Sequence, residues 1–301
     1  MTISVAKAFL ENSGISYKLN EPMANHTSFK IGGAADLFVQ PKSVDELQTL
    51  LRFSKQEDIP AFILGKGSNL LVSDKGIEGM VISTSGLNAI RLVGDNCIYA
   101  EAGASLTALC LFAKEQGLSG LEFAYGIPGS VGGALYMNAG AYGGEMSQVV
   151  TSAQSITEDG EISRKVDELQ LSYRHSVFCE GNEVITSAIF SLTPGEKEKI
   201  WADMELYMSK RRASQPLDYP SAGSTFKRPT GYFAAALIDE CGLKGLTVGG
   251  ARVSEKHAGF VINGGDASCR DVCELIGQIQ QKVKESKGVT LETEVIFTGR
   301  R

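Results

Sequence analysis

The sequence of 301 residues predicts a mixed fold of helices and strands, of the α+β or α/β class, that contains a nucleotide-binding domain. Three observations support this prediction. Helical and strand-like segments alternate along the first half of the chain. The 34 glycines cluster at the ends of expected strands, where tight turns approach ligands. The length is sufficient for two or three domains, each with its own core.

The first half of the chain supplies the alternation. Residues 43–57 have helical spacing and begin with a capping box formed by Ser43 and Glu46. A second amphipathic helix is expected at 105–116, ending at Gly117. Three apolar runs predict buried or half-buried strands: 61–64, 79–84 and 97–103.

The second half begins with a long amphipathic helix at 195–212. The segment ASQPLDYPSAG that follows contains two prolines, so a linker or domain boundary is expected there. Four further elements are expected: a helix at 231–241, a strand at 257–263, a helix at 269–287 and a strand at 291–298.

Charge and composition exclude several function classes. The net charge of −6 opposes a surface that binds nucleic acid, and the densest cationic run, SKRR at 209–212, suits the end of a helix. The N-terminus lacks a signal peptide and no apolar run would span a bilayer, so a cytoplasmic protein without membrane association is expected. Cys269 and Cys273 lack the histidine or second cysteine pair of a zinc site, so no metal is expected.

Two glycine-rich segments are candidates for ligand binding. In GKGSN (65–69), two glycines after a strand suit a pyrophosphate, although an ordinary tight turn has the same composition. In GIPGSVGGALYMNAGAYGGE (126–145), seven glycines weaken any helix, and close packing on a sheet is the alternative to a ligand. Pro128 suits the first position of a helix, which would direct the N–H groups of 129–131 at an anion. The two segments together favour a ligand.

Ser224, in AGSTFKRP (222–229), lacks the sequence context of a nucleophile. It has no G-x-S-x-G pattern, and the S-x-x-K spacing with Lys227 recurs near the N-terminus at Ser4 and Lys7. A hydroxyl group can instead donate a proton when its neighbours shape its environment. Arg174, at an expected strand end, suits a carboxylate or a surface ion pair. In LETEV (291–295), alternation along a strand would place Glu292 and Glu294 on the same face.

The chain resembles the UDP-N-acetylenolpyruvoylglucosamine reductase family. Eight segments carry the resemblance in colinear order: HTSFKIGGAA (26–35), GKGSNLL (65–71), GIPGSVGGALYMNAGAYG (126–143), YRHSVF (173–178), AGSTFKRP, LIDECGLKG (237–245), GGARVSEKHAGFVIN (249–263) and LETEV. The sequence departs from the family where Thr293 replaces a proline and where Arg228 replaces the asparagine of some members. It also resembles the shorter subclass that lacks an inserted lid.

The resemblance implies an α+β fold, with a two-lobed FAD-binding domain of the vanillyl-alcohol-oxidase type and a C-terminal substrate-binding domain. The implied boundaries are 1–84 for the first lobe, rejoined by 295–301, then 85–205 for the second lobe and 206–294 for the substrate domain. It also implies a monomer that uses FAD, with NADPH and UDP-N-acetylglucosamine enolpyruvate as substrates and UDP-N-acetylmuramate as product.

The resemblance also implies residue roles. Ser224 would donate a proton to C2 of the substrate after hydride reaches C3, and Arg174 and Glu294 would stabilise the intermediate. Substrate binding is implied for Tyr173, Arg174, Lys227, Lys244 and His257, although His257 equally suits a structural histidine. The implied FAD contacts are Gly65, Lys66, Gly67, Ser68, Asn69, Leu70, Gly126, Ile127, Pro128, Gly129, Ser130, Gly133, Asn138, Gly140 and Ala141.

Three other functions compete with the reductase. A flavin-dependent alcohol or sugar oxidase of the same fold would have no need of the 222–229 and LETEV motifs. An S-x-x-K hydrolase would leave both glycine segments unexplained. A non-catalytic flavin-binding module would tolerate the loss of Ser224.

Overall fold

The computed structural model describes residues 3–301. Contacts between Cα atoms divide the chain into two units. The first contains residues up to Lys18, Leu37–Lys66 and Gly79–Arg211, and the second contains Leu19–Asp36, Gly67–Glu78 and Arg212–Arg301. The mixture of helices and strands confirms the expected α+β class. The finer domain boundaries drawn from the sequence stay a prediction.

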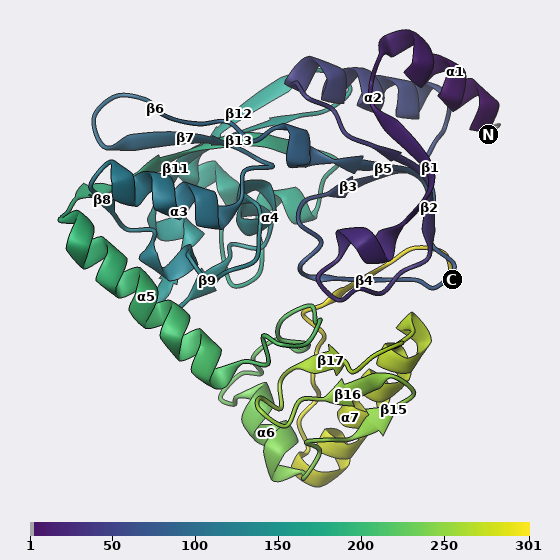
Figure 1. Cartoon of the computed structure of the whole chain (residues 1–301), viewed down its shortest axis with the longest axis vertical. Helices are drawn as coiled ribbons and strands as arrows, with labels where there is room; N and C mark the ends of the chain where they lie inside the picture. Colours follow the sequence, from purple (N-terminus) through teal and green to yellow (C-terminus); the bar gives the residue numbers. More distant parts are fainter. Residues whose placement is uncertain (1–2) are drawn as a thin grey trace. The chain divides into compact units, whose positions relative to one another are not determined.

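A four-stranded sheet covered by two helices forms around one of the cores (Figure 1). Its strands, in spatial order, are β1 (Tyr17–Pro22), β2 (Ala34–Val39), β5 (Ile77–Ser83) and β3 (Ala61–Leu64). The helices are α1 (Ile3–Ser13) and α2 (Val44–Gln56). Ser43 caps α2 by accepting from the N–H of Glu46, as expected. The rings of Phe9 and Phe53 stack between the two helices, with centroids 3.8 Å apart.

A five-stranded antiparallel sheet forms a second core in the first unit. Its strands, in spatial order, are β12 (Glu161–Lys165), β11 (Val150–Ile156), β13 (Val184–Ser191), β7 (Cys97–Glu101) and β6 (Ile90–Leu92). The helices α3 (Leu106–Glu115) and α4 (Val131–Tyr136) bury apolar side chains in this core. So does the long helix α5 (Lys197–Ser214), through Ile200 and Met204.

Short elements complete the first unit. The pairs are β8 (Leu118–Ser119) with β14 (Thr193–Pro194), and β9 (Gly140–Ala141) with β10 (Gly144–Glu145). The single-turn helices are η2 (Thr84–Gly86), η3 (Glu122–Ala124), η4 (Met146–Gln148), η5 (Val166–Leu169) and η6 (Val177–Cys179).

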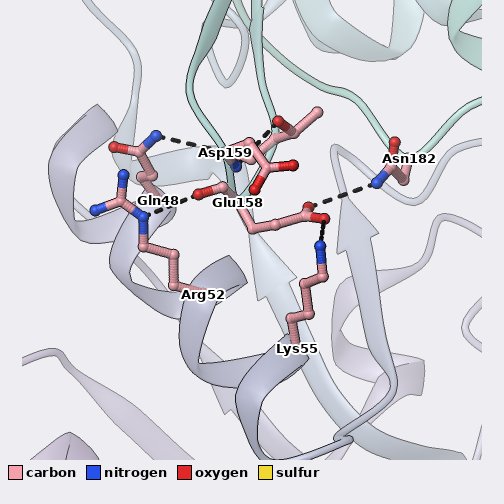
Figure 2. A network of polar contacts seen from close by, with 7 residues as sticks. Gln48, Arg52, Lys55, Glu158, Asp159 and Asn182 are labelled. Carbon is pink, nitrogen blue, oxygen red and sulfur yellow. Dashed lines mark hydrogen bonds and ion pairs between the residues drawn. The ribbon is translucent and has the colours of Figure 1, made fainter.

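A polar network ties α2 to the turn between β11 and β12 (Figure 2). The ammonium of Lys55 lies 2.5 Å from the carboxylate of Glu158, and Arg52 donates to the backbone carbonyl of Glu158 at 2.9 Å. Asn182 donates to the same carboxylate at 3.5 Å. The hydrogen bond from Lys55 lowers the pKa of Glu158, and the same bond raises the pKa of Lys55.

The second unit contains a three-stranded antiparallel sheet and two helices (Figure 1). The strands are β15 (Thr247–Val248), β16 (Ala251–Val253) and β17 (Val261–Asn263), and the helices are α6 (Ala234–Glu240) and α7 (Cys269–Lys287). Both helices and the strands β16 and β17 share one apolar core. Two further strands, β4 (Leu70–Val72) and β18 (Ile296–Thr298), pair in parallel, and η1 (Met23–His26) precedes β2.

Two expected strands are shorter in the structure. Residues 257–260 form a turn, because the N–H of Phe260 donates to the carbonyl of His257, and β17 begins only at Val261. Residues 291–295 form no strand, apart from one bridge between Thr293 and Phe226, and β18 begins at Ile296. The prediction of strands over the whole of 257–263 and 291–298 was therefore wrong.

Two further findings concern membranes and metals, for residues 3–301. No helix in that range combines the length and apolar character needed to cross a bilayer. No three His, Cys, Asp or Glu side chains in the same range cluster as a metal site would require. All six cysteines are free thiols, and Cys110 and Cys269 are buried in the cores.

Candidate active site

The two glycine-rich segments meet within the first unit. A Cβ atom at Gly65 would lie 2.6 Å from the hydroxyl oxygen of Ser130, closer than atoms pack. Ser130 is buried and caps α4 by accepting from the N–H of Gly133. Gly65 is therefore required for the backbone of the first segment to approach the start of α4.

Two other residues of GKGSN hold the second unit together. Gly67 has a positive φ of 61°, and a Cβ atom there would lie 2.1 Å from the carbonyl oxygen of His26. The side-chain amide of Asn69 donates to the carbonyl of Glu294 at 3.2 Å, and the carbonyl of Asn69 accepts from the N–H of Ile296 at 2.9 Å. These contacts explain both residues without a ligand, so their expected FAD contacts stay a prediction.

Within the segment 126–145, α4 begins later than the position of Pro128 predicts. Ser130 is the N-cap of α4, so Pro128 lies two residues outside the helix and not at its first position. The N–H of Gly129 donates to the carbonyl of Ile127, and the N–H of Val131 donates to the carbonyl of Ala104. Protein carbonyls therefore accept from two of the three N–H groups that were expected to point at an anion, and the expectation for the N–H of Ser130 stays a prediction.

Neither a close approach within the described residues nor a positive φ explains why position 133 is a glycine. The other six glycines of the segment either approach another group closely or have a positive φ. Gly133 is exposed inside α4, without a positive φ, and its nearest neighbour is a hydroxyl oxygen at an ordinary 3.4 Å. Glycine in a helix costs about 1 kcal/mol relative to alanine. The bare backbone at Gly133 therefore fits the close approach of a flat ring system such as a flavin.

Asn138 lies at the C-terminal end of α4 and is buried, with only 1% of its surface exposed. Its side-chain amide donates to the carbonyl of Ser172 at 3.1 Å, and its side-chain oxygen accepts from the N–H of Ser147 at 3.0 Å. The side chain thus connects the end of α4 to the segment that carries Arg174.

The sequence predicts Arg174 at the end of a strand. In the structure it lies in a tight turn instead. Ser172 and His175 exchange two backbone hydrogen bonds, of 3.1 and 3.2 Å, with Tyr173 and Arg174 between them. Arg174 has a φ of 57°, in the left-handed region. Its guanidinium lies 5.0 Å from the ring centre of Tyr173, which is half exposed. The turn therefore presents a cation and an aromatic ring side by side.

Ser224 belongs to the second unit, in a segment that Thr225 fixes on two sides. The N–H of Thr225 donates to the carbonyl of Gly259 at 2.8 Å, and its carbonyl accepts from the N–H of Glu294 at 2.8 Å. Its buried hydroxyl accepts from the N–H of Val261 at 3.0 Å. The structure thus brings the segments of Ser224 and Glu294 together. Sequence reasoning missed Thr225, because a threonine beside a candidate serine has no distinguishing signal.

The two glutamates of LETEV differ in their surroundings. Glu292 is exposed, and its carboxylate pairs with the ammonium of Lys227 at 3.6 Å. Glu294 is half buried, and its backbone is bonded on one side to Thr225 and on the other to Asn69. Because Glu294 is the more buried and the more tightly held, it is the better candidate for chemistry.

The other expected substrate-binding residues also lie in the second unit. Lys244 pairs with Asp239 at 2.6 Å. His257 is half buried, its Nδ1 accepts from the N–H of Gly259 at 3.2 Å, and its ring meets Phe260 edge-on. Burial lowers the pKa of His257, and the nearby ammonium of Lys244 adds to that effect. Because Nδ1 accepts from Gly259, the neutral form of His257 carries its proton on Nε2, which leaves that nitrogen as a hydrogen-bond donor.

Comparison with known proteins gives consistent matches. Residues 35–164 match the family model of an FAD binding domain, and residues 215–298 match that of the UDP-N-acetylenolpyruvoylglucosamine reductase C-terminal domain. A UDP-N-acetylenolpyruvoylglucosamine reductase of Syntrophomonas wolfei is 51% identical over 284 residues, covering 94% of this chain and 95% of that protein. The enzyme of the same name from Listeria monocytogenes serotype 4b is 49% identical, covering 95% of this chain and 96% of that protein.

Among solved structures, the UDP-N-acetylenolpyruvylglucosamine reductase of Thermus caldophilus is similar over nearly the whole chain. The TM-score is 0.80 and the sequence identity is 34%. The match covers 94% of this chain and 98% of that one.

Proposed function

Because the chain belongs to the UDP-N-acetylenolpyruvoylglucosamine reductase family, we propose that it reduces UDP-N-acetylglucosamine enolpyruvate to UDP-N-acetylmuramate, with NADPH as the reductant. Membership confirms the resemblance drawn from the eight motifs. It makes the chain an oxidoreductase of peptidoglycan precursor synthesis with an FAD-binding domain. The expectations of a monomer and of a cytoplasmic location stay predictions.

One observation supports the proposed chemistry more than any other. Thr225 fixes the segment of Ser224 against the backbone of Glu294, so a hydroxyl and a carboxyl group are held on adjacent segments. A reaction that adds hydrogen across a carbon–carbon double bond needs a proton donor and a group that stabilises charge. The two side chains supply these functions.

The residues that would hold FAD are those of the two glycine segments. Gly133 presents bare backbone beside Ser130, which suits close contact with the cofactor, and Gly65 lets the first glycine segment approach the same serine. When bound and reduced by NADPH, FAD supplies a hydride to C3 of the enolpyruvyl group. The remaining proposed contacts are Lys66, Gly67, Ser68, Asn69, Leu70, Gly126, Ile127, Pro128, Gly129, Gly140 and Ala141. Asn138, which the sequence led us to expect among them, bonds through both of its side-chain polar atoms to protein groups and is not proposed as a contact.

Arg174 and Glu294 would stabilise the charge that develops on the substrate. Hydride addition at C3 pushes an electron pair toward the carboxylate, which then has enolate character. An arginine can pair with both of its oxygens and lower the energy of this intermediate. A protonated Glu294 would donate a further hydrogen bond to the same group.

Ser224 would complete the reaction by donating its hydroxyl proton to C2. The enolate of a carboxylate is a stronger base than an alkoxide, so the transfer is favourable despite the weak acidity of serine. The serine regains its proton from solvent. Lys227, Lys244, His257 and Tyr173 would bind the sugar nucleotide, with the two ammonium groups exchanging their carboxylate partners for the diphosphate.

The test separates the two half-reactions. The purified protein is first scanned for flavin absorbance, then reduced anaerobically with NADPH and mixed with UDP-N-acetylglucosamine enolpyruvate. Bleaching by NADPH and recovery with the enolpyruvyl substrate alone are expected. Recovery with oxygen alone would identify an oxidase, and a protein that takes up no FAD would contradict the cofactor.

The role of Ser224 has a separate test in the same apparatus. Ser224→Ala should leave flavin reduction nearly unchanged and slow reoxidation by about 10²–10⁴-fold, because only the second half-reaction needs the proton. Equal slowing of both halves would refute Ser224 as the proton donor.

A further inference from the structure

We propose that Asn138 is a positioning residue that fixes the turn carrying Arg174. This inference rests on the proposed function of Arg174. It also differs from the expectation that Asn138 contacts FAD.

The turn needs support from outside itself. A residue other than glycine in the left-handed region costs about 1–2 kcal/mol. Such a conformation persists only where surrounding contacts determine it. Arg174 has this conformation, with a φ of 57°, and two backbone bonds between Ser172 and His175 close the turn around it.

Asn138 supplies the first outside contact. Its side-chain amide donates to the carbonyl of Ser172, the same oxygen that accepts the N–H of His175. Its side-chain oxygen is held by the N–H of Ser147, which fixes the orientation of the amide. Because the residue is 1% exposed, water cannot replace either bond.

A second contact arises from the same end of α4. The carbonyl of Tyr136 accepts from the hydroxyl of Ser176 at 2.9 Å and from the thiol of Cys179 at 3.2 Å. Ser176 is fully buried. The turn of Arg174 is thus held on one side by Asn138 and on the other by Tyr136, both at the C-terminal end of α4.

The contacts of Asn138 favour positioning over cofactor binding. Both polar atoms of its side chain bond to protein groups, and its backbone N–H donates to the carbonyl of Leu135. The side chain of Asn138 therefore transmits the position of α4 to Arg174.

The test uses the isosteric variant Asn138→Asp. Aspartate tolerates the positive φ of 40° at this position and can still accept from Ser147, but its ionised carboxylate cannot donate to the carbonyl of Ser172. Ser54→Ala is the matched control, because it removes a buried side-chain bond to a carbonyl of the same unit, that of Ile59 at 2.6 Å.

Three results are expected for Asn138→Asp and not for the control. Hydrogen exchange of the His175 amide should accelerate by about tenfold or more. The reason is that the loss of one buried hydrogen bond lowers the free energy needed to open the turn. Reoxidation by the enolpyruvyl substrate should slow by about 10–100-fold, since a misplaced charge loses transition-state stabilisation. Flavin reduction by NADPH and the affinity for FAD should change by less than about threefold.

A double variant makes the test specific. If Asn138 acts through Arg174, adding Asn138→Asp to Arg174→Lys should slow reoxidation little beyond the single Arg174→Lys change. Multiplicative effects, or unchanged reoxidation in Asn138→Asp, would overturn the inference. Loss of FAD affinity with slowing of both half-reactions would instead identify Asn138 as a cofactor contact.

If Asn138→Asp does not fold, Asn138→Ser removes the same donor without a charge and is tested in its place. If the wild-type flavin is not reoxidised by the enolpyruvyl substrate, the proposed function fails. His175 exchange then still decides whether Asn138 fixes the turn.

Discussion

The turn of Arg174 and the segment of Ser224 are fixed by different kinds of contact. At the end of α4, the side chain of Asn138 and the backbone carbonyl of Tyr136 hold the turn of Arg174, and that turn contains a strained residue. Backbone groups hold the segment of Ser224 on both sides, and the buried hydroxyl of Thr225 adds a side-chain contact. Placement of Arg174 therefore depends on the identity of distant side chains. Placement of Ser224 depends mainly on the path of the main chain.

The largest expected effect follows from the strain at Arg174. Arg174→Gly and Arg174→Ala should both slow reoxidation by about 10³-fold, because each removes the charge that stabilises the intermediate. Only glycine relieves the left-handed conformation, so the glycine variant should be about 1 kcal/mol more stable than the alanine variant. Chemical denaturation of both proteins measures the difference, and equal stabilities would show that the turn is unstrained.

The next largest effect concerns the segment of Ser224. Thr225→Val keeps the shape of the side chain but leaves the buried N–H of Val261 without its acceptor, which should cost about 1–3 kcal/mol of stability. Backbone bonds to Gly259 and Glu294 remain, so reoxidation should slow by less than about tenfold. Thr225→Ser keeps the hydroxyl and is the control. A rate loss as large as that of Ser224→Ala would show that the main chain does not suffice.

The smallest effect concerns the charged contact between Lys55 and Glu158, far in sequence from both candidate catalytic segments. The pKa of Glu158 is lowered from about 4.5 by its bond to Lys55, so its contribution to stability is present above that pH and is lost as the pH falls further. Melting temperatures of wild-type and Glu158→Gln proteins should therefore differ slightly at pH 7 and converge in acid. A difference that persists at pH 3 would contradict this account.

Periodicity predicted the long helices because their determinants are local. Ser43 begins α2 as expected, and α7 spans Cys269 to Lys287 as expected, with Ser268 capping its start and Gly288 ending it. The prediction of a strand at LETEV was wrong because the determinants of this segment are not local. Its path is set by Thr225 and by Asn69, which is 225 positions away from Glu294.

The candidate site likewise combines residues that the sequence predicts with contacts that it does not predict. Motifs identified Arg174, Ser224 and Glu294 by resemblance, but not the turn of Arg174, whose positive φ depends on contacts made at the end of α4. Thr225 was missed because nothing in a single sequence marks the hydroxyl that joins two segments. Contacts of this kind become visible only in three dimensions.

The parallel pairing of β4 with β18 has a consequence for the order of synthesis. A ribosome that adds about 5–20 residues per second completes β18 about 10–45 s after β4. During that interval the nascent chain carries β4 as an unpaired apolar edge, the kind of edge at which chains associate wrongly. The second unit therefore matures late in translation, and chaperone binding during this interval would protect the edge until its partner arrives.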